Sequence, residues 1–296
     1  MRSSAEVLDE LRCLVSVHAR PDMRTAIDCL AVAKVGTAMP EAGLTEPLLV
    51  VLVQGGKRIL LGGNVFEYRA GQCLLATANL PITGNFLGAT PEVPAMGLSI
   101  ALRAPVIAPL LREIPAGRFA DCPPQPAIAT CDADVHLLDA LVRMVGLLDH
   151  PDAIPVLAPM IEREILWRLL TGPLGAMVRQ VGLADSGLSR IGRVIQWIRD
   201  NYAEPIRIAD LARLAGMSES ALHRHFRAIT ALSPVQYQKR IRLQEARALL
   251  IARAGDVAGV AHLVGYESAS QFSREYRRLF DASPAQDALR LRADGG

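Results

Sequence analysis

The sequence of 296 residues predicts an α+β protein with a β-rich first part and an all-helical C-terminal part. Two observations lead to this prediction. Within residues 27–103, short apolar runs separated by Gly turns recur at roughly ten-residue spacing, which is typical of a small β-barrel or jelly roll. Between Pro205 and Pro284, one helical pattern occurs twice, which indicates an internal repeat.

The first part begins with a short helix over residues 1–20, which has one apolar side. Strands follow as short apolar runs bounded by glycine. The predicted strands are 48–53, 59–61, 65–68, 73–76 and 96–102, with turns at 62–64 and 70–71. A barrel of this size can hold a small molecule at its mouth, since barrel mouths are common ligand sites. A purely structural or dimerising barrel is the alternative.

Residues 132–149 predict a helix that is apolar on an unusually wide face. One stripe steps by 4, 3 and 4 residues, as a short heptad seam does, and a second apolar stripe adjoins it. The seam consists of Leu137, Leu141, Met144 and Leu148. A surface helix needs only one apolar stripe. We therefore expect one stripe to pack on the barrel and the seam to join a second copy in a homodimer. A helix buried within one subunit is the alternative.

A second helical region, 155–180, is interrupted at 171–173, and 183–189 reads as a linker. Each copy of the repeat then predicts a helix, a tight turn and a second helix. Gly216 and Gly265 are placed to end the first helices, because glycine readily adopts positive φ. Ser218 and Ser268 are placed to cap the second helices, the latter in a capping box with Gln271.

The second helix of each copy has an apolar side and an opposite side that carries arginine. In the first copy Leu222 and Phe226 lie four residues apart and face inward. In the second copy Phe272 and Tyr276 do the same. The outward residues at matching offsets are Ser220, Arg224 and Arg227, and then Ser270, Arg274 and Arg277. Two ordinary amphipathic helices with solvated arginines are the alternative, which the matched offsets disfavour.

Such helices suit the major groove of double-stranded DNA, where Arg bonds the O6 and N7 atoms of guanine. From residue 188 onward there are 17 Lys or Arg against 11 Asp or Glu, but 15 against 19 before it, so the basic part contains the repeat. Neutralisation of phosphates requires such a balance. We assign base readout to Arg224 and Arg274, with Ser220, His223, Ser270 and Gln271 beside them, and phosphate contacts to Arg227, Arg277 and Arg278.

With its two copies each closed by Ser-Pro, the segment 190–292 resembles the paired helix-turn-helix domain of the AraC/XylS family of transcription regulators. The resemblance implies two recognition helices in successive major grooves, held by a rigid linking helix. Ser233 and Pro234 begin that helix here, and it can run to about Ala252. Its length of about 27 Å is close to one DNA turn of about 34 Å. Asp281 and Ala282 depart from the family, in which many members have glycine.

Residues 68–74 are similar to the turn-and-strand signature of cupins, and 54–58, 65–68 and 163–173 resemble the AraC-type regulators with a cupin-like N-terminal module. The resemblance implies an arm and a cupin-like effector-binding β-barrel (1–125), a helical dimerisation and linker region (126–187) and a DNA-binding domain of two helix-turn-helix motifs (188–296). It implies a regulator of promoter DNA, controlled by an unknown small-molecule effector, with RNA polymerase as a further partner.

The sequence argues against an enzyme. Metallocupins bind metal mainly through histidines, and this chain has no His between Ala19 and Val135. We therefore expect no metal, no cofactor and no catalytic base in the barrel. Two alternatives stay open. One is a metal-free cupin-type isomerase fused to a DNA-binding domain, and the other is an effector-independent dimeric regulator.

The cysteines and the hydropathy indicate an intracellular setting. The five cysteines are Cys13, Cys29, Cys73, Cys122 and Cys131, an odd number without a CxxC zinc pattern. Cys73 is a candidate sensor thiol if nearby cations lower its pKa, although a buried, inert thiol is commoner. No apolar run reaches 18 residues and no signal peptide is present, so we expect a cytoplasmic protein without a membrane segment.

Overall fold

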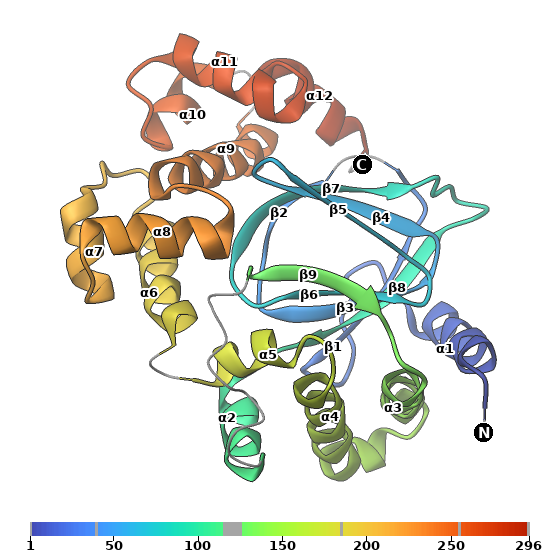
Figure 1. Cartoon of the computed structure of the whole chain (residues 1–296). Coiled ribbons are helices and arrows are strands. Elements are labelled where there is room, and N and C mark those ends of the chain that lie inside the picture. Colours follow the sequence, from blue (N-terminus) through green and yellow to red (C-terminus); the bar gives the residue numbers. More distant parts are fainter. Residues whose placement is uncertain (1, 39–40, 115–125, 184–185, 254–255, 295–296) are drawn as a thin grey trace. The chain divides into compact units, whose positions relative to one another are not determined.

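The computed structural model describes residues 2–38, 41–114, 126–183, 186–253 and 256–294 (Figure 1). They fall into two compact units, each with its own hydrophobic core. The first unit comprises residues 1–190 and 228–231, and the second comprises residues 191–227 and 232–296. The helices expected to form a separate dimerisation and linker region share the core of the first unit with its strands.

The first unit contains all the strands found in the described residues. They are β1 (Leu30–Val35), β2 (Glu41–Thr45), β3 (Leu48–Gln54), β4 (Gly56–Leu61), β5 (Asn64–Arg69), β6 (Gln72–Ala76), β7 (Leu80–Leu87), β8 (Ala95–Ala101) and β9 (Ile128–Asp132). The helices are α1 (Ser4–His18), α2 (Ala104–Glu113), α3 (Val135–Gly146), α4 (Ile154–Thr171) and α5 (Gly175–Gly182), with 3-10 turns at Leu147–Asp149 and Pro151–Ala153.

The strands form two antiparallel sheets. One has the order β1-β8-β3-β6-β9 and the other the order β2-β7-β4-β5. Figure 1 shows the two sheets stacked face to face. The α+β class is confirmed, and of the small β-barrel and the jelly roll that the sequence allowed, the two separate sheets agree with the jelly roll, which is a two-sheet sandwich. The turn at Gly71, whose φ is +82°, carries the chain from β5 in one sheet to β6 in the other, so these consecutive strands do not pair.

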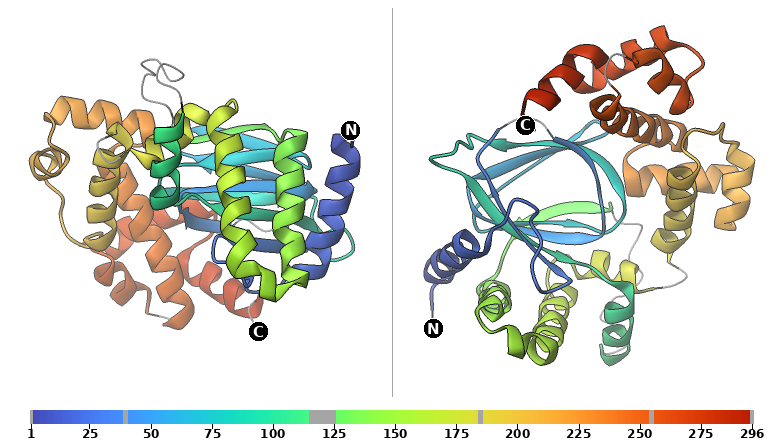
Figure 2. Two further views of the ribbon diagram at one scale, coloured as in Figure 1. Left: turned by 90° about the horizontal axis from the view of Figure 1, so that it is seen from below. Right: turned by 180° about the vertical axis from the view of Figure 1, so that it is seen from behind.

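Helices cover one face of the five-stranded sheet. Figure 2 shows α1, α3 and α4 lying side by side across it. Residues directly opposite each other on neighbouring strands share a face. Val32, Leu98 and Val51 form such a row, and all three belong to the core that the helices complete. Alternate residues of these strands, such as Val50, face the four-stranded sheet instead.

The seam predicted on α3 is not exposed, and its assignment to dimerisation is corrected. Leu137 is 3% exposed, while Leu141 and Met144 are fully buried. Leu148 is partly buried against the same core. The adjoining stripe is buried as well, because α3 lies between α1 and α4 over the sheet. Each fully buried Leu or Met contributes about 1.5–3 kcal/mol to the stability of the unit. Both stripes are therefore used within the chain.

Five elements of the first unit were not predicted individually, namely the helix α2 and the strands β1, β2, β7 and β9. The helix α2 has proline at its start and at Pro109 inside it, and proline normally marks a helix boundary. The strand β9 is only five residues long and follows a proline-rich stretch that reads as loop. The strand β9 lies at the edge of the five-stranded sheet, beside β6.

The second unit is all-helical. Its helices are α6 (Gly187–Asp200), α7 (Ile208–Ala215), α8 (Glu219–Thr230), α9 (Pro234–Ala252), α10 (Val257–Leu263), α11 (Ala269–Phe280) and α12 (Pro284–Asp294). The predicted start and end of the linking helix are confirmed in α9. Ser233 and Gln236 form a capping box there, with Pro234 in the first turn. In Figure 1, α9 runs between the α7–α8 pair and the α10–α11 pair.

Candidate nucleic-acid interface and ligand cavity

The first helix-turn-helix forms from α7 and α8 as predicted. Gly216 ends α7 in the left-handed conformation with φ +63°. The hydroxyl of Ser218 accepts a hydrogen bond from the backbone of the first turn of α8 at 3.3 Å. Leu222 and Phe226 are fully buried, and the Phe226 ring meets Tyr237 edge-on with 5.5 Å between centroids. The opposite side of α8 therefore faces outward.

The second helix-turn-helix forms from α10 and α11. Gly265 makes the turn with φ +84°, and Ser268 accepts a hydrogen bond from the Gln271 backbone N–H at 3.3 Å. The predicted cap is confirmed, but its second half differs. The Gln271 side chain donates to Glu275 at 3.2 Å, one turn further along the helix. Both aromatic anchors predicted for α11 are fully buried.

The predicted outward orientation holds for every residue that was assigned to DNA contact. The exposed residues are Ser220, His223, Arg224 and Arg227 on α8, and Ser270, Gln271, Arg274, Arg277 and Arg278 on α11. None of these five arginines is ion-paired to another residue that the structure describes. The guanidinium groups therefore keep their hydrogen-bond donors available for phosphate or guanine oxygens.

A hydroxyl pair begins both outward faces. The Ser218 and Ser220 hydroxyls lie 3.2 Å apart, and those of Ser268 and Ser270 lie 2.9 Å apart. The matching pairs place one cap hydroxyl beside one outward hydroxyl in each copy. The identical Ser-x-Ser spacing of the two copies could have shown this relation in the sequence.

Arg242 on α9 connects the segment before the first copy to the turn of the second copy, and sequence reasoning missed it. Its guanidinium donates to the carbonyl oxygens of Tyr202 at 2.7 Å and Ala203 at 3.0 Å, before α7. It also donates to the Gly265 carbonyl oxygen at 2.7 Å, in the second turn. One arginine thus connects the segment that precedes the first motif to the turn of the second motif. Nothing in the local pattern distinguishes Arg242 from a solvated helix arginine, because its acceptors lie far away in sequence.

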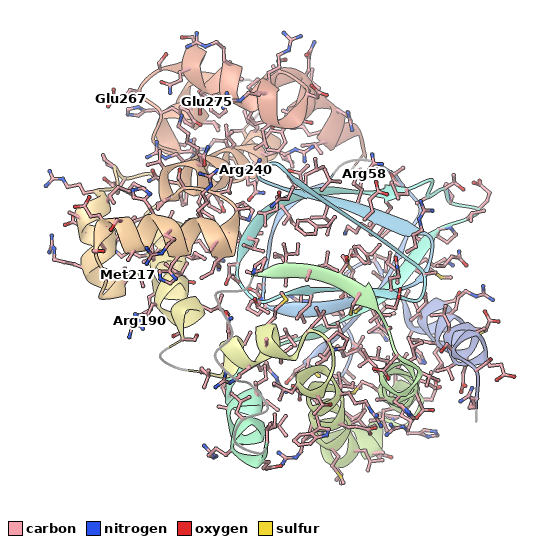
Figure 3. The ribbon with its side chains drawn as sticks, viewed as in Figure 1. Arg58, Arg190, Met217, Arg240, Glu267 and Glu275 are labelled. Atoms are coloured by element: carbon pink, nitrogen blue, oxygen red, sulfur yellow. The ribbon has the colours of Figure 1, made fainter. Side chains whose placement is uncertain are left out.

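Glu275, labelled in Figure 3, anchors the inner edge of α11. It accepts hydrogen bonds from Lys239 of α9 at 2.8 Å, from the Tyr266 hydroxyl at 2.8 Å and from Gln271. Burial alone would raise the pKa of this carboxyl, but the three donors outweigh it and hold the pKa below its ordinary value. Gln271 is therefore positioned by Glu275 while its amide carbonyl stays available.

A buried network fixes α11 to α9 and α12. Tyr276 donates its hydroxyl to Asp287 at 2.7 Å, and Arg247 donates to the same carboxylate at 2.8 and 3.2 Å. Asp287 is 1% exposed. Burial and the neighbouring Asp287 carboxylate both raise the pKa of Tyr276. The charge on Asp287 is thus paired and hydrogen-bonded, as a buried charge must be.

The first unit holds a cavity of about 190 Å³ between its two sheets. Small side chains form much of the wall contributed by the five-stranded sheet, among them Ala31, Ala33 and Gly97. The opposite wall carries Lys57, Tyr68 and Phe86, which stand in one row because Lys57 pairs with the other two across neighbouring strands. The cavity exists because small residues face large ones.

Lys57 provides the positive charge in this cavity wall. Its Nζ atom lies 4.2 Å from the centroid of the Phe86 ring, a distance that allows a cation–π contact. Tyr68 is 1% exposed, and burial raises the pKa of its hydroxyl, which therefore stays protonated. The cavity is mostly apolar, with a cation and a hydroxyl on one wall. Such a lining suits a small apolar molecule with an acidic or polar end.

Cys73 does not face this cavity. Its side chain is fully buried in the core on the helix side of the sheet. Its hydrogen bond with Cys131 and its burial raise the pKa of the Cys73 thiol, whereas a sensor thiol acting alone needs a lowered pKa.

Cys122 lies outside the described residues. Within the described ranges, no group of three or more His, Cys, Asp or Glu side chains is placed to hold a metal ion. None of the described helices has the length and apolar character needed to cross a membrane.

Two regions of the chain match known protein families. Residues 26–177, which are 152 of the 296 residues, match the family described as AraC-type transcriptional regulator N-terminus. This match contains both sheets and the helices α2 to α4. Residues 211–289 match a helix-turn-helix domain family, and that match contains α8 to α11.

Relatives and solved structures give a consistent picture. The HTH-type transcriptional activator RhaS of Escherichia coli strain SE11 is 29% identical over 148 residues. That alignment covers 50% of this chain and 53% of RhaS, so the chain spans about half the length of the curated relatives it matches. A substituted apo form of ToxT from Vibrio cholerae strain SCE256 aligns with TM-score 0.57 at 10% identity, over 90% of this chain and 99% of ToxT. Wild-type ToxT with a bound unsaturated fatty acid aligns with TM-score 0.55 at 10% identity, over 88% and 94%. These two likenesses show the fold alone.

Proposed function

We propose that this chain, which belongs to the AraC-type transcriptional regulators, binds promoter DNA in a sequence-specific manner and so controls transcription. The observation that supports this most is the pair of matching outward faces on α8 and α11. Each face begins with a hydroxyl pair and presents arginines that are exposed. The shared helix α9 and the Arg242 contacts hold both faces in one unit.

The roles of the outward residues follow from their places on the helices. Arg224 and Arg274 lie near the middle of each exposed face and reach base edges, where bidentate contact with guanine discriminates between bases. Arg227, Arg277 and Arg278 lie toward the helix ends and hold phosphates, which position the unit without specifying a sequence. Removing a base-reading arginine should cost about 1–3 kcal/mol, which is roughly 5- to 150-fold in affinity.

The test begins with duplexes selected from a randomised pool by the full chain. Arg224→Ala and Arg274→Ala should each relax base preference at one half-site, and Arg227→Ala should weaken all duplexes about equally. Arg12→Ala, which removes the same charge from exposed α1, is the matched control and should leave binding unchanged. Base preferences of Arg224→Ala and Arg274→Ala that match those of the unaltered chain would contradict the assignment.

We propose further that a small apolar effector with an anionic end binds in the cavity between the sheets and controls DNA binding. The lining by small apolar side chains, with Lys57 beside Phe86, supports this proposal. ToxT, which shares the fold, has been solved with an unsaturated fatty acid, a ligand of the same apolar-carboxylate chemistry. At about 190 Å³ the cavity is smaller than drug-sized sites of about 300–1,000 Å³, so a short ligand fits best.

A thermal-shift measurement on the full chain tests the effector proposal. Short fatty acids and aromatic carboxylates should raise the melting temperature, and their neutral amides should raise it less. Lys57→Met should remove the difference between acid and amide. Arg58→Met, at the next position of β4 and half-exposed (Figure 3), is the matched control. If no compound shifts the unaltered chain, the effector-independent regulator becomes the better hypothesis.

We propose that the chain acts as a homodimer through α4 and not through α3. Val156 and Met160 are 66% and 64% exposed, and Leu157 and Trp167 extend the same apolar stripe. Arg163 and Glu113 form an exposed ion pair beside it, so the surface carries both charges. A two-fold interface needs such a self-complementary patch.

Contact with RNA polymerase stays a prediction, and no described feature favours the isomerase alternative.

Sedimentation of the full chain decides the dimer proposal. The double variant Val156→Glu with Met160→Glu should sediment as a monomer. Val17→Glu, at an exposed apolar position of α1, is the control and should leave the dimer intact. A monomeric unaltered chain, or a dimer that survives the double variant, would rule out this interface.

A further inference from the structure

The two thiols of Cys73 and Cys131 meet across neighbouring strands. They are directly opposite each other on β6 and β9, and their sulfur atoms lie 2.9 Å apart although 58 residues separate them in sequence. Cys73 is fully buried, whereas Cys131 is partly exposed. Both are free cysteines. Among the described cysteines, the sheet thus brings together one fully buried and one partly buried residue.

The strand register makes the geometry suitable for a covalent bond. The backbone hydrogen bonds from Thr77 to Ala127 and from Ala133 to Gly71, on either side, place Cys73 and Cys131 in the hydrogen-bonded class of pairs. The Cα atoms of such a pair are about 5.5 Å apart. That separation lies within the range of about 4.4–6.8 Å that a disulfide spans. The Cα separation of this pair is therefore one that a disulfide can span.

We propose that Cys73 and Cys131 form a reversible disulfide under peroxide stress, which ties the edge strand β9 to β6. Because β9 is an edge strand and β6 is its neighbour in the sheet, the bond pins one end of that sheet. The helix α3 begins four residues after Cys131, so the bond also fixes the start of this helix. This modification site is independent of the DNA-binding and effector proposals.

The chemistry assigns a different part to each sulfur. Hydrogen bonding from Cys73 lowers the pKa of Cys131, although burial and the nearby Asp132 and Asp134 oppose this. The Cys131 thiolate attacks hydrogen peroxide, which forms a sulfenic acid and releases hydroxide. The Cys73 sulfur then attacks the Cys131 sulfur, the S–O bond breaks and water leaves. In total, two thiols and one peroxide become one disulfide and two waters. A thiol reductant reverses the reaction by thiol–disulfide exchange.

Peptide mapping of the full chain without reductant tests the proposal. After treatment with hydrogen peroxide, we expect one cross-linked peptide pair that contains Cys73 and Cys131, and dithiothreitol should release it. In Cys73→Ser, which keeps a hydroxyl donor beside Cys131, Cys131 should instead be trapped as a sulfenic acid by dimedone. Cys13→Ser removes an exposed thiol on α1 and should leave the cross-link unchanged.

Two physical measurements report the effect of the cross-link on the folded chain, namely the melting temperature and hydrogen exchange. Oxidation should raise the melting temperature by several degrees and slow hydrogen exchange of the β9 amides, and Cys131→Ser should show neither effect. Peroxide that modifies Cys13 while Cys73 and Cys131 stay as thiols would overturn the proposal. A cross-link that leaves β9 exchange unchanged would overturn the pinning of that strand.

Discussion

The two helix-turn-helix copies present similar outward faces, but different buried contacts support the two recognition helices. Phe226 and Tyr276 occupy matching positions, as do Tyr237 and Asp287 fifty residues apart. In the first copy the pair is aromatic, with an edge-on ring contact. In the second copy it is a hydrogen bond from Tyr276 to a buried carboxylate that Arg247 neutralises. The comparison teaches that one surface pattern can rest on an apolar or on an ionic core, and that the ionic core depends on every partner being present.

The largest expected effect comes from breaking the ionic core. Arg247→Met leaves the Asp287 carboxylate buried without its cation, which should lower the free energy of unfolding by about 3–5 kcal/mol. The double variant Arg247→Met with Asp287→Leu should recover part of that loss, because it removes the unpaired carboxylate and leaves only the Tyr276 hydroxyl without its acceptor. Urea unfolding of both variants measures this. A double variant no more stable than the single one would contradict the account.

The next largest effect should come from the turn glycines, because substituting them by alanine should destabilise the two copies by different amounts. A Cβ atom at Gly265 would lie 2.1 Å from the Ala203 carbonyl oxygen and 2.9 Å from the Arg242 guanidinium carbon, whereas a Cβ at Gly216 meets no atom within 4 Å. Both have positive φ, so both variants pay for the left-handed conformation. Gly265→Ala should cost about 2–4 kcal/mol and Gly216→Ala about 1–2 kcal/mol. Thermal unfolding of both variants compares their losses of stability. Equal losses would show that neighbouring atoms move away from the Cβ atom at position 265.

Glu275, in the second copy, should make stability depend on pH. Its folded pKa lies below the ordinary value near 4.5, so its contribution is present above that value and is lost as pH falls through the folded pKa. Glu275→Gln should lower the free energy of unfolding by about 1 kcal/mol at pH 7. The gap between the variant and the unaltered chain should narrow below about pH 4.5. A gap that is constant from pH 7 to pH 3 would exclude the ionised carboxylate as its cause.

The smallest effect should come from the loops before α9 and α12. Ala231 and Asp281 occupy matching positions and both have φ +58°. Glycine, which many family members have at the position of Asp281, adopts this left-handed conformation without strain. Alanine is less tolerant of this conformation than aspartate. Ala231→Gly should therefore stabilise the chain by about 0.5–1 kcal/mol, and Asp281→Gly by less. Chemical unfolding with a precision of a few tenths of a kcal/mol separates them, and the reverse order would be inconsistent with this explanation.

Local sequence patterns were sufficient to predict the two helix-turn-helix motifs of the second unit. The 3.6-residue periodicity, the glycines and the serine caps placed the predicted pairs of helices and the outward arginines, because these features act within one or two turns of chain. The same patterns were insufficient for residues whose partners are distant. Arg242 and Asp287 read as ordinary helix residues, and only folding brings their acceptors and donors to them.

In the first unit, the sequence by itself determined most of the individual strands, their glycine turns and the α+β class, because alternation and turn chemistry are local. Only the tertiary structure decided that the strands form two separate sheets, that α3 is covered on both apolar stripes and that Cys73 meets Cys131. The physical reason is that periodicity shows that a face is apolar but not which element buries it. The pairing of strands is likewise set by the packing of the whole unit.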